Sequence, residues 1–332
     1  MSLRKDYLSE MRVNSVGFKE RKSRFPKNAF LAILYILVIL IIAVGVLSFI
    51  SGFNLTHPKK IETPQITSNI APDYRNVSFY CIESKEKLNG WYFSALGSKN
   101  TVLIVHGYGQ NRLPFGEDTF RLISMLNDKG YNVMSFDLRG AGNSAGSIST
   151  FGKNEKVDVM SALKYLKQQG AEKIIILGYS TGASASLSAL LETPYRDSIA
   201  GIIADSPYSK VDNFIEDLIS EETHYPSFPF DHTIKLVVKQ ICKADSSLDI
   251  IPKIPDIIPT PVLFIDGNQE NFKHYGNTKL MYEMYSRKHP TTAYYWNSGA
   301  TDYLGSYLKY PDEYVNRVLE FIDIAMKKIV EK

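Results

Sequence analysis

The stretch KIIILGYSTGAS, Lys173–Ser184, is an apolar run that ends in the pattern Gly-x-Ser-x-Gly. In this pattern the two glycines let a buried strand turn tightly into a helix, and the turn lifts the serine hydroxyl above the edge of the sheet. The helix that begins at Thr181 directs its N-terminal amides and the positive end of its dipole at the same place. The stretch therefore predicts a nucleophile elbow centred on Ser180. A serine hydroxyl is inert near neutral pH without a base, so the rest of the chain has to be searched for one.

Around this turn, apolar strand-like segments alternate with helix-like segments. The buried runs include NTVLIVHG, YNVMSFDLRG, IAGIIADSP and TPVLFIDG. The stretches with helical spacing are FRLISMLNDKG, EKVDVMSALKYLKQQG, which closes on Gly170, and the closing PDEYVNRVLEFIDIAMKKIVEK. The aromatic and β-branched runs NVSFYCIES and LNGWYFSAL predict an antiparallel entry pair. Near-continuous apolar strands separated by helices are typical of a mostly parallel, doubly wound sheet covered on both faces. The fold class is therefore α/β.

One connection is far longer than the others. About fifty residues, 208–260, separate IADSP from TPVLF, and they contain the amphipathic stretches VDNFIEDLIS and HTIKLVVKQICK. An ordinary crossover needs only about 10–12 residues. The insertion is expected to form a helical cap over the carboxyl edge of the sheet, where doubly wound folds bind ligands. Packing decoration of the sheet is the alternative.

The N-terminal region carries a candidate membrane anchor. Residues Ala29–Ile50, AFLAILYILVILIIAVGVLSFI, contain no charge and are apolar on all sides, and their length crosses a hydrocarbon core of about 30 Å. A basic segment precedes them, so the positive-inside rule places the N-terminus in the cytoplasm and the rest of the chain outside. The expected organisation is a basic cytoplasmic segment at 1–28, a transmembrane anchor at 29–50, a linker at 51–72 and a domain at 73–332.

Composition excludes several other classes of protein. The net charge of +3 over 332 residues gives no argument for nucleic-acid binding. The only cysteines, Cys81 and Cys242, are not spaced with histidine as zinc ligands are, so no metal and no cofactor are expected. Two buried free thiols are expected, with a single disulfide as the alternative.

An oxyanion hole needs a second backbone amide besides that of Thr181, and the loop after the third strand supplies it in this kind of fold. That loop reads LIVHGYGQNR, which makes the amide of Tyr108 the partner of the Thr181 amide. His106, in the same loop, is expected to buttress the loop and not to act as a base.

With these motifs in order, the chain resembles the α/β-hydrolase superfamily over nearly everything from Asp73 onward. The resemblance rests on VHGYGQNR, FDLRGAGNSAG, GYSTGA, ADSP and PVLFIDG. It looks most like membrane-anchored bacterial hydrolases related to the prolyl-oligopeptidase and dienelactone-hydrolase types, which carry a helical cap. The resemblance implies a serine hydrolase that cleaves an ester, thioester or amide of a small acyl substrate through an acyl-enzyme.

The sequence departs from this family where the acid and the base belong. After PVLFI the family usually reads His-Gly-x-x-Asp, whereas this chain reads DGNQE, so that Asp266 replaces the histidine and Glu270 takes the acid position. In GATDYLGSYLKYPDEY, Tyr303 stands where relatives carry the catalytic histidine, and no histidine follows His289. Only about 0.1% of a tyrosine with a pKa near 10 is phenolate at pH 7, so Tyr303 is a poor base by default.

Three other histidines are candidates for a replacement base: His274 in the acid loop, and His224 and His232 in the cap. Three hypotheses therefore remain open. The chain is an anchored serine hydrolase with an unidentified base, a pseudo-hydrolase that binds a ligand or a protein partner at the membrane, or a sensor that is acylated on Ser180 and does not turn over.

Overall fold

The computed structural model describes residues 27–64, 72–268, 277–302 and 304–330, and divides the chain into two compact units, Met1–Ala43 and Val44–Lys332. In the first unit the described residues belong to helix α1 (Lys27–Thr56), whose remaining turns belong to the second unit. The helix is long and apolar enough to cross a membrane, and its apolar side chains are largely exposed.

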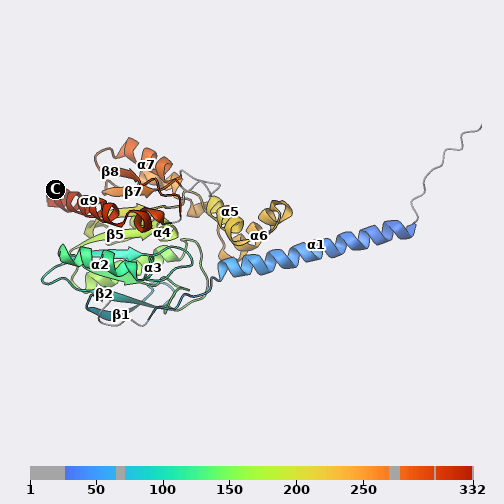
Figure 1. The fold of residues 1–332 in the computed structure, drawn as a ribbon, viewed down its shortest axis with the longest axis horizontal. Coiled ribbons are helices and arrows are strands. Elements are labelled where there is room, and N and C mark those ends of the chain that lie inside the picture. The colour runs from blue at the N-terminus through green and yellow to red at the C-terminus, as the bar shows by residue number, and fades with distance from the viewer. Residues whose placement is uncertain (1–26, 65–71, 269–276, 303, 331–332) are drawn as a thin grey trace, which may run out of the picture. The chain divides into compact units, whose positions relative to one another are not determined.

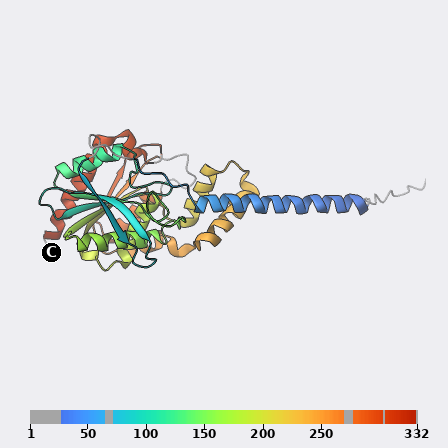
Figure 2. The same ribbon diagram turned by 90° about the horizontal axis from the view of Figure 1, so that it is seen from below.

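The second unit is built on one eight-stranded sheet in the order β1-β2-β4-β3-β5-β6-β7-β8 (Figures 1 and 2). β1, β2 and β4 pair in antiparallel fashion, and all pairs from β4 to β8 are parallel. This confirms the expected antiparallel entry pair and the parallel sheet. The strands are β1 (Tyr74–Tyr80), β2 (Lys87–Phe93), β3 (Asn100–Val105), β4 (Asn132–Phe136), β5 (Lys173–Tyr179), β6 (Ile199–Asp205), β7 (Val262–Asp266) and β8 (Ala293–Asn297).

Helices cover both faces of the sheet, and each face has its own apolar core. One core takes in side chains of α3, α4 and α7, and the other takes in side chains of α2, α8 and α9. The helices are α2 (Asp118–Asp128), α3 (Glu155–Gln168), α4 (Thr181–Glu192), α7 (Asn277–Lys288), α8 (Gly305–Lys309) and α9 (Pro311–Val330). The sequence patterns predict α2, α3, α4 and α9 but not α7 or α8. Helix α7 (NTKLMYEMYSRK) is mostly polar and has few core side chains, so it shows no clear apolar periodicity. Helix α8 has only five residues, which is too short for a periodic pattern.

The long insertion after β6 forms two helices, α5 (Val211–Glu222) and α6 (Ser227–Cys242), followed by short 3₁₀ turns. Ion pairs join the two helices, between Lys235 and Glu216 at 2.5 Å and between Lys239 and Asp212 at 2.7 Å. In both views the helix pair projects from the carboxyl edge of the sheet (Figures 1 and 2). We refer to α5, α6 and the loop that joins them as the cap.

The end of α1 differs from the expectation of a linker that begins at residue 51. The helix continues to Thr56, and Leu55 and Thr56 are buried in the second unit. The carbonyl of Thr56 accepts a hydrogen bond from the amide of Ser149 at 2.9 Å. The apolar run ends at Ile50 because polar residues follow it, and this end predicts the start of a linker. The residues that follow stay helical because they pack against the domain.

Candidate active site

Ser180 occupies a strained turn between β5 and α4. Its backbone has φ +49° and ψ −120°, a conformation that non-glycine residues rarely adopt. The Ser180 amide donates to the carbonyl of Asp205 at 2.8 Å, and the Ser180 carbonyl accepts from the amide of Ser184 at 3.1 Å. These bonds fix the turn from both sides, and the side chain of Ser180 is almost fully enclosed.

The two glycines of the pattern are required by close backbone contacts. A Cβ atom on Gly178 would lie 2.7 Å from the Cα atom of Ala183, and one on Gly182 would lie 2.6 Å from the carbonyl oxygen of Val105. Both distances are shorter than real Cβ contacts. The first turn of α4 thus packs directly on the backbone at the end of β3, and this contact holds Thr181 close to the loop that carries Tyr108.

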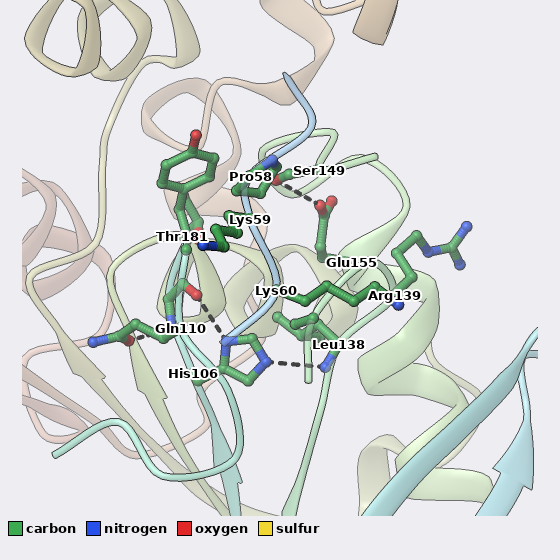
Figure 3. A pocket seen from close by; sticks show the side chains of 15 residues that line it. Pro58, Lys59, Lys60, His106, Gln110, Leu138, Arg139, Ser149, Glu155 and Thr181 are labelled. Atoms are coloured by element: carbon green, nitrogen blue, oxygen red, sulfur yellow. Dashed lines mark hydrogen bonds between the residues drawn. The ribbon is translucent and has the colours of Figure 1, made fainter. Parts of the chain in front are cut away.

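Tyr108 and Thr181, the two residues of the expected oxyanion hole, line the same small pocket. Figure 3 shows this pocket with Thr181 labelled. Its volume is about 20 Å³, which is enough for about one water molecule. The Tyr108 loop is held by Gln110, whose Oε1 accepts from the Gly107 amide at 3.0 Å. The structure therefore brings together the two residues whose amides are predicted to stabilise an oxyanion. The other walls come from the segment after α1, the loop after β4 and the start of α3: Pro58, Lys59, Lys60, Leu138, Arg139, Gly140, Ala141, Ser149 and Glu155.

His106 has the structural role expected from the sequence. Its Nδ1 donates to the carbonyl of Gly107 at 2.7 Å, and its Nε2 accepts from the amide of Leu138 at 3.0 Å (Figure 3). Burial lowers the pKa of this imidazole, which is consistent with the neutral ring that these two bonds require. With both nitrogens engaged, His106 joins the loop after β3 to the loop after β4.

The loops after β7 and β8, which carry the expected acid and base positions, meet at the same sheet edge as Ser180. The amide of Asn268 donates to the carbonyl of Ala300 at 2.6 Å, and the Oγ of Ser298 donates to the carbonyl of Asp266 at 3.1 Å. Three sequence candidates belong to these loops but lie outside the described residues: Glu270, His274 and Tyr303.

Neither the two histidines of the cap nor His289, which directly follows α7, is placed as a base for Ser180. His224 and His232 are exposed on the cap. His289 packs on Tyr285 and precedes β8, so it lies at the amino edge of the sheet, away from the carboxyl edge that carries Ser180.

A buried ion pair that no sequence pattern predicts supports the Tyr108 loop. Arg112 reaches Asp137 through its guanidinium at 2.5 Å and through its backbone amide at 2.8 Å. The second oxygen of Asp137 also accepts from the amide of Asn143 at 2.8 Å. Arg112 belongs to the motif VHGYGQNR and Asp137 to the motif FDLRGAGNSAG, but only the pairing of strands β3 and β4 shows that the two side chains meet.

The two cysteines are buried free thiols, as expected. Cys242 donates to the carbonyl of Ser149 at 3.1 Å, and the sulfur of Cys81 accepts from Arg139 at 3.2 Å.

Asp205, at the end of β6, is a buried carboxyl directly beneath the elbow. Its Oδ1 accepts from the Oγ of Ser206 at 2.9 Å. Within the part of the chain that the structure describes, its Oδ2 and the hydroxyls of Tyr179 and Tyr314 are buried without a hydrogen-bond partner. Burial raises the pKa of Asp205 to about 7. Near pH 5, native Asp205 therefore holds a proton that the unfolded chain, with a pKa near 3.8, has already released.

This difference makes stability fall as pH rises from about 4 to about 7, because the native state binds more protons over that range. The loss is at most about 1.4 kcal/mol per pH unit. We expect Asp205→Asn to flatten the pH dependence of the free energy of unfolding, measured by urea denaturation in detergent micelles between pH 5 and 8. Equal slopes for the variant and the unmodified chain would contradict the shifted pKa.

The side chain of Tyr108 ties its loop to helix α1. Its hydroxyl donates to the carbonyl of Leu55 at 2.7 Å, and its ring packs on Phe151 and Phe214. For the ester hydrolysis that the sequence predicts, we expect Tyr108→Phe to lower kcat about five-fold with little change in KM. The reason is that one hydrogen bond contributes about 1 kcal/mol. Tyr208→Phe is the matched control, because it removes a hydroxyl bonded to the carbonyl of Phe151 at 2.5 Å in the same aromatic cluster. Equal losses in both variants would indicate general packing and not positioning of the Tyr108 amide.

Comparisons with known proteins agree with the observed fold. Residues 97–226 match the family model described as serine aminopeptidase, S33. The chain is 28% identical to YqkD of Bacillus subtilis over 244 residues, covering 71% of this chain and 75% of that protein. It is 29% identical over 124 residues to the lysophosphatidylserine lipase ABHD12 of Gallus gallus, and spans only about a third (32%) of that relative.

Solved structures share the whole domain. The Pyrococcus furiosus esterase Pf2001 superimposes with a TM-score of 0.66 at 25% identity, covering 81% of this chain and 97% of that one. An alpha-beta hydrolase from Vibrio vulnificus gives a TM-score of 0.59 at 19% identity, with coverage of 83% and 93%. The chain therefore has the α/β-hydrolase fold, and these similarities support a hydrolase of the esterase or lipase type.

Proposed function

We propose that the protein is a membrane-anchored serine hydrolase that cleaves an ester, thioester or amide through an acyl-enzyme on Ser180. The observation that carries the proposal is the elbow itself. Ser180 holds a strained backbone conformation between β5 and α4, at a place where Gly178 and Gly182 leave no room for side chains. Strain of this kind persists where the surrounding structure enforces it, and it is common at catalytic positions.

In the proposed reaction the Oγ of Ser180 attacks the substrate carbonyl, and the developing oxyanion receives hydrogen bonds from the amides of Tyr108 and Thr181. The base takes the Oγ proton and passes it to the leaving alcohol, thiol or amine as the acyl-enzyme forms. Water then gives a proton to the same base and attacks the acyl carbon, and the base returns the proton to Ser180 as the acid is released. The buried pair Arg112–Asp137 and the bonds of His106 keep the Tyr108 loop in place during both steps.

The acid and the base are assigned from the sequence. Glu270 is proposed as the acid, and Tyr303 occupies the position at which relatives carry histidine. A triad is defined by geometry and not by sequence position, so a base from another segment, such as His274, is compatible with the proposal.

Membrane attachment through Ala29–Ile50 is the second part of the proposal. The charge-free run in α1 supports it, together with the excess of basic residues before it. The expected topology has the N-terminus in the cytoplasm and the hydrolase domain outside.

The test uses the full chain in detergent micelles, because α1 contributes buried residues to the domain. The protein is incubated with a fluorophosphonate probe and, separately, with a chromogenic short-chain ester. Labelling with steady ester turnover is the expected result. Absence of labelling in a folded chain would overturn the proposal, and an initial burst of product without turnover would indicate the acylated sensor.

A pseudo-hydrolase that binds a ligand or a protein partner at the membrane is the second candidate. The observation in its favour is the sequence itself, which has tyrosine at the expected base position and no histidine after His289. Failure to label, combined with a folded domain, would favour this candidate.

A further inference from the structure

Cap helix α6 lies alongside the last turns of α1, and the two helices run in the same direction. The Oγ atoms of Ser48 and Thr233 are 2.7 Å apart. Four residues further along both helices, Gly52 faces Val237 so closely that a Cβ atom on Gly52 would lie 2.6 Å from that side chain. Two contacts separated by one helical turn in each helix fix the register between α6 and α1 (Figures 1 and 2).

This register sets the level of the cap relative to the apolar run of α1. Ser48 is the third residue from the end of the run Ala29–Ile50, so Thr233 lies level with the run and not beyond it. Phe228 precedes Thr233 by five residues, at the start of α6. The backbone of Phe228 is not helical (φ −99°, ψ 130°), so the regular helix begins at Pro229. Pro229 lies about 6 Å from Thr233 in the N-terminal direction of α1, since a helix rises 1.5 Å per residue, and Phe228 directly precedes it.

The cap carries exposed apolar side chains near the start of α6. Phe228 is 81% exposed, and Tyr225, which stacks on Phe230 with ring centroids 4.5 Å apart, is 39% exposed. Val46, Phe49 and Ile50, in the last turns of the apolar run of α1, are also exposed. Exposed apolar side chains therefore occur both on the cap and on the part of α1 against which the cap packs.

From this geometry we infer that the loop joining α5 to α6, residues 223–230, inserts into the outer interface of the bilayer that α1 spans. The inference rests on the proposed membrane anchor and extends it, because the cap becomes a second membrane contact. Aromatic side chains favour this depth, where one part of the ring is apolar and another is hydrated. Such a contact would let an acyl substrate reach Ser180 from the lipid phase, so the substrate class is an amphiphilic ester that resides in the membrane.

Charges near the loop limit the depth of insertion. Glu221 and Glu222 end α5, and Asp231 follows Phe230. Carboxylates are costly in the hydrocarbon core, so these groups stay among the lipid headgroups and only the rings of Tyr225 and Phe228 reach below them.

The insertion is tested by tryptophan fluorescence in the full chain reconstituted into phosphatidylcholine vesicles. Single variants Phe228→Trp, Leu236→Trp and Leu96→Trp are compared with the unmodified chain, which supplies the background of Trp91 and Trp296. Leu236 lies beyond Thr233 at the end of the apolar run, and exposed Leu96 precedes β3 at the opposite edge of the sheet. Quenching by acyl-brominated lipid is expected in the order Phe228→Trp, Leu236→Trp, Leu96→Trp.

Two outcomes overturn the inference. Equal quenching of Phe228→Trp and Leu96→Trp would show that the cap stays in water. Protection of Phe228→Trp from aqueous iodide without quenching by brominated lipid would show that protein, such as a second copy, covers the surface. Neither measurement needs catalytic activity, so the inference about the cap and the proposed hydrolysis fail independently.

A second measurement addresses the substrate. Phe228→Ser is expected to lower turnover of a long-chain lysophospholipid in vesicles about ten-fold, in proportion to the burial energy of one aromatic ring, while turnover of soluble p-nitrophenyl acetate stays unchanged. Equal losses on both substrates would contradict delivery from the membrane. Absence of turnover on both substrates in the unmodified chain would count against the proposed function and leave the fluorescence result standing.

Discussion

Replacing Ser180 with alanine is expected to abolish fluorophosphonate labelling and to lower ester turnover by about 10⁴-fold to 10⁶-fold if the other catalytic groups are intact. The reason is chemical, since the Oγ of Ser180 is the atom that bonds to the probe and to the acyl group. Folding should be little affected, because the substitution removes one buried oxygen and leaves the backbone bonds of the elbow in place. Labelling is measured by in-gel fluorescence of the reconstituted full chain, and turnover by release of p-nitrophenol.

Ser186→Ala is the matched control. Ser186 is also buried in α4, and its hydroxyl donates to the carbonyl of Gly182 at 2.7 Å, one turn from the elbow. The control should label normally. If Ser180→Ala still labels while Ser186→Ala does not, the nucleophile has been assigned to the wrong serine.

Restoring histidine at position 303 is expected to raise ester turnover by about ten-fold or more if the base is the missing component. Tyrosine is almost entirely protonated at pH 7, whereas an imidazole with a pKa near 6.5 can accept the serine proton. A gain from Tyr303→His should appear in kcat with a rising limb between about pH 6 and 7, measured with the soluble ester. The double variant Ser180→Ala/Tyr303→His should show no gain.

Tyr303→Phe separates the two possible roles of the native tyrosine. If the hydroxyl of Tyr303 takes part in the reaction, Tyr303→Phe should lower turnover. If a different residue is the base, turnover should stay the same in Tyr303→Phe, and Tyr303→His should bring little benefit. No gain from Tyr303→His in a folded chain would mean that the loop after β8 does not direct residue 303 at Ser180.

The sequence predicts the sheet well because its strands are buried on both faces and therefore read as continuous apolar runs. The elbow is predicted equally well, since a strand, two glycines and a helix of small residues leave one serine at the turn. Helix α7 is not predicted from the sequence because only a few of its side chains, including Met281 and Tyr285, reach the core. The ion pair Arg112–Asp137 is not predicted either, because a contact between residues 25 positions apart depends on which strands are neighbours.

The positions of the proposed acid and base in space are not determined by such sequence patterns. Their loops follow β7 and β8, and the bond from Asn268 to Ala300 shows that the starts of the two loops lie together. Glu270 and Tyr303 remain predictions from the sequence, because loop conformations depend on local hydrogen bonds that no periodic pattern encodes.

Because the end of α1 packs on the domain, an insertion in this helix is expected to affect the Tyr108 loop. Ser48, Gly52 and Leu55 contact the cap and the Tyr108 loop, so the last turns of α1 are part of the packed second unit and not a linker. One alanine inserted after Gly52 would turn the residues that follow by about 100° and advance them about 1.5 Å. Leu55 would then leave Tyr108 while Ser48 kept its place, so a single residue added to α1 would loosen the Tyr108 loop. A flexible linker of the same length would absorb the insertion without effect.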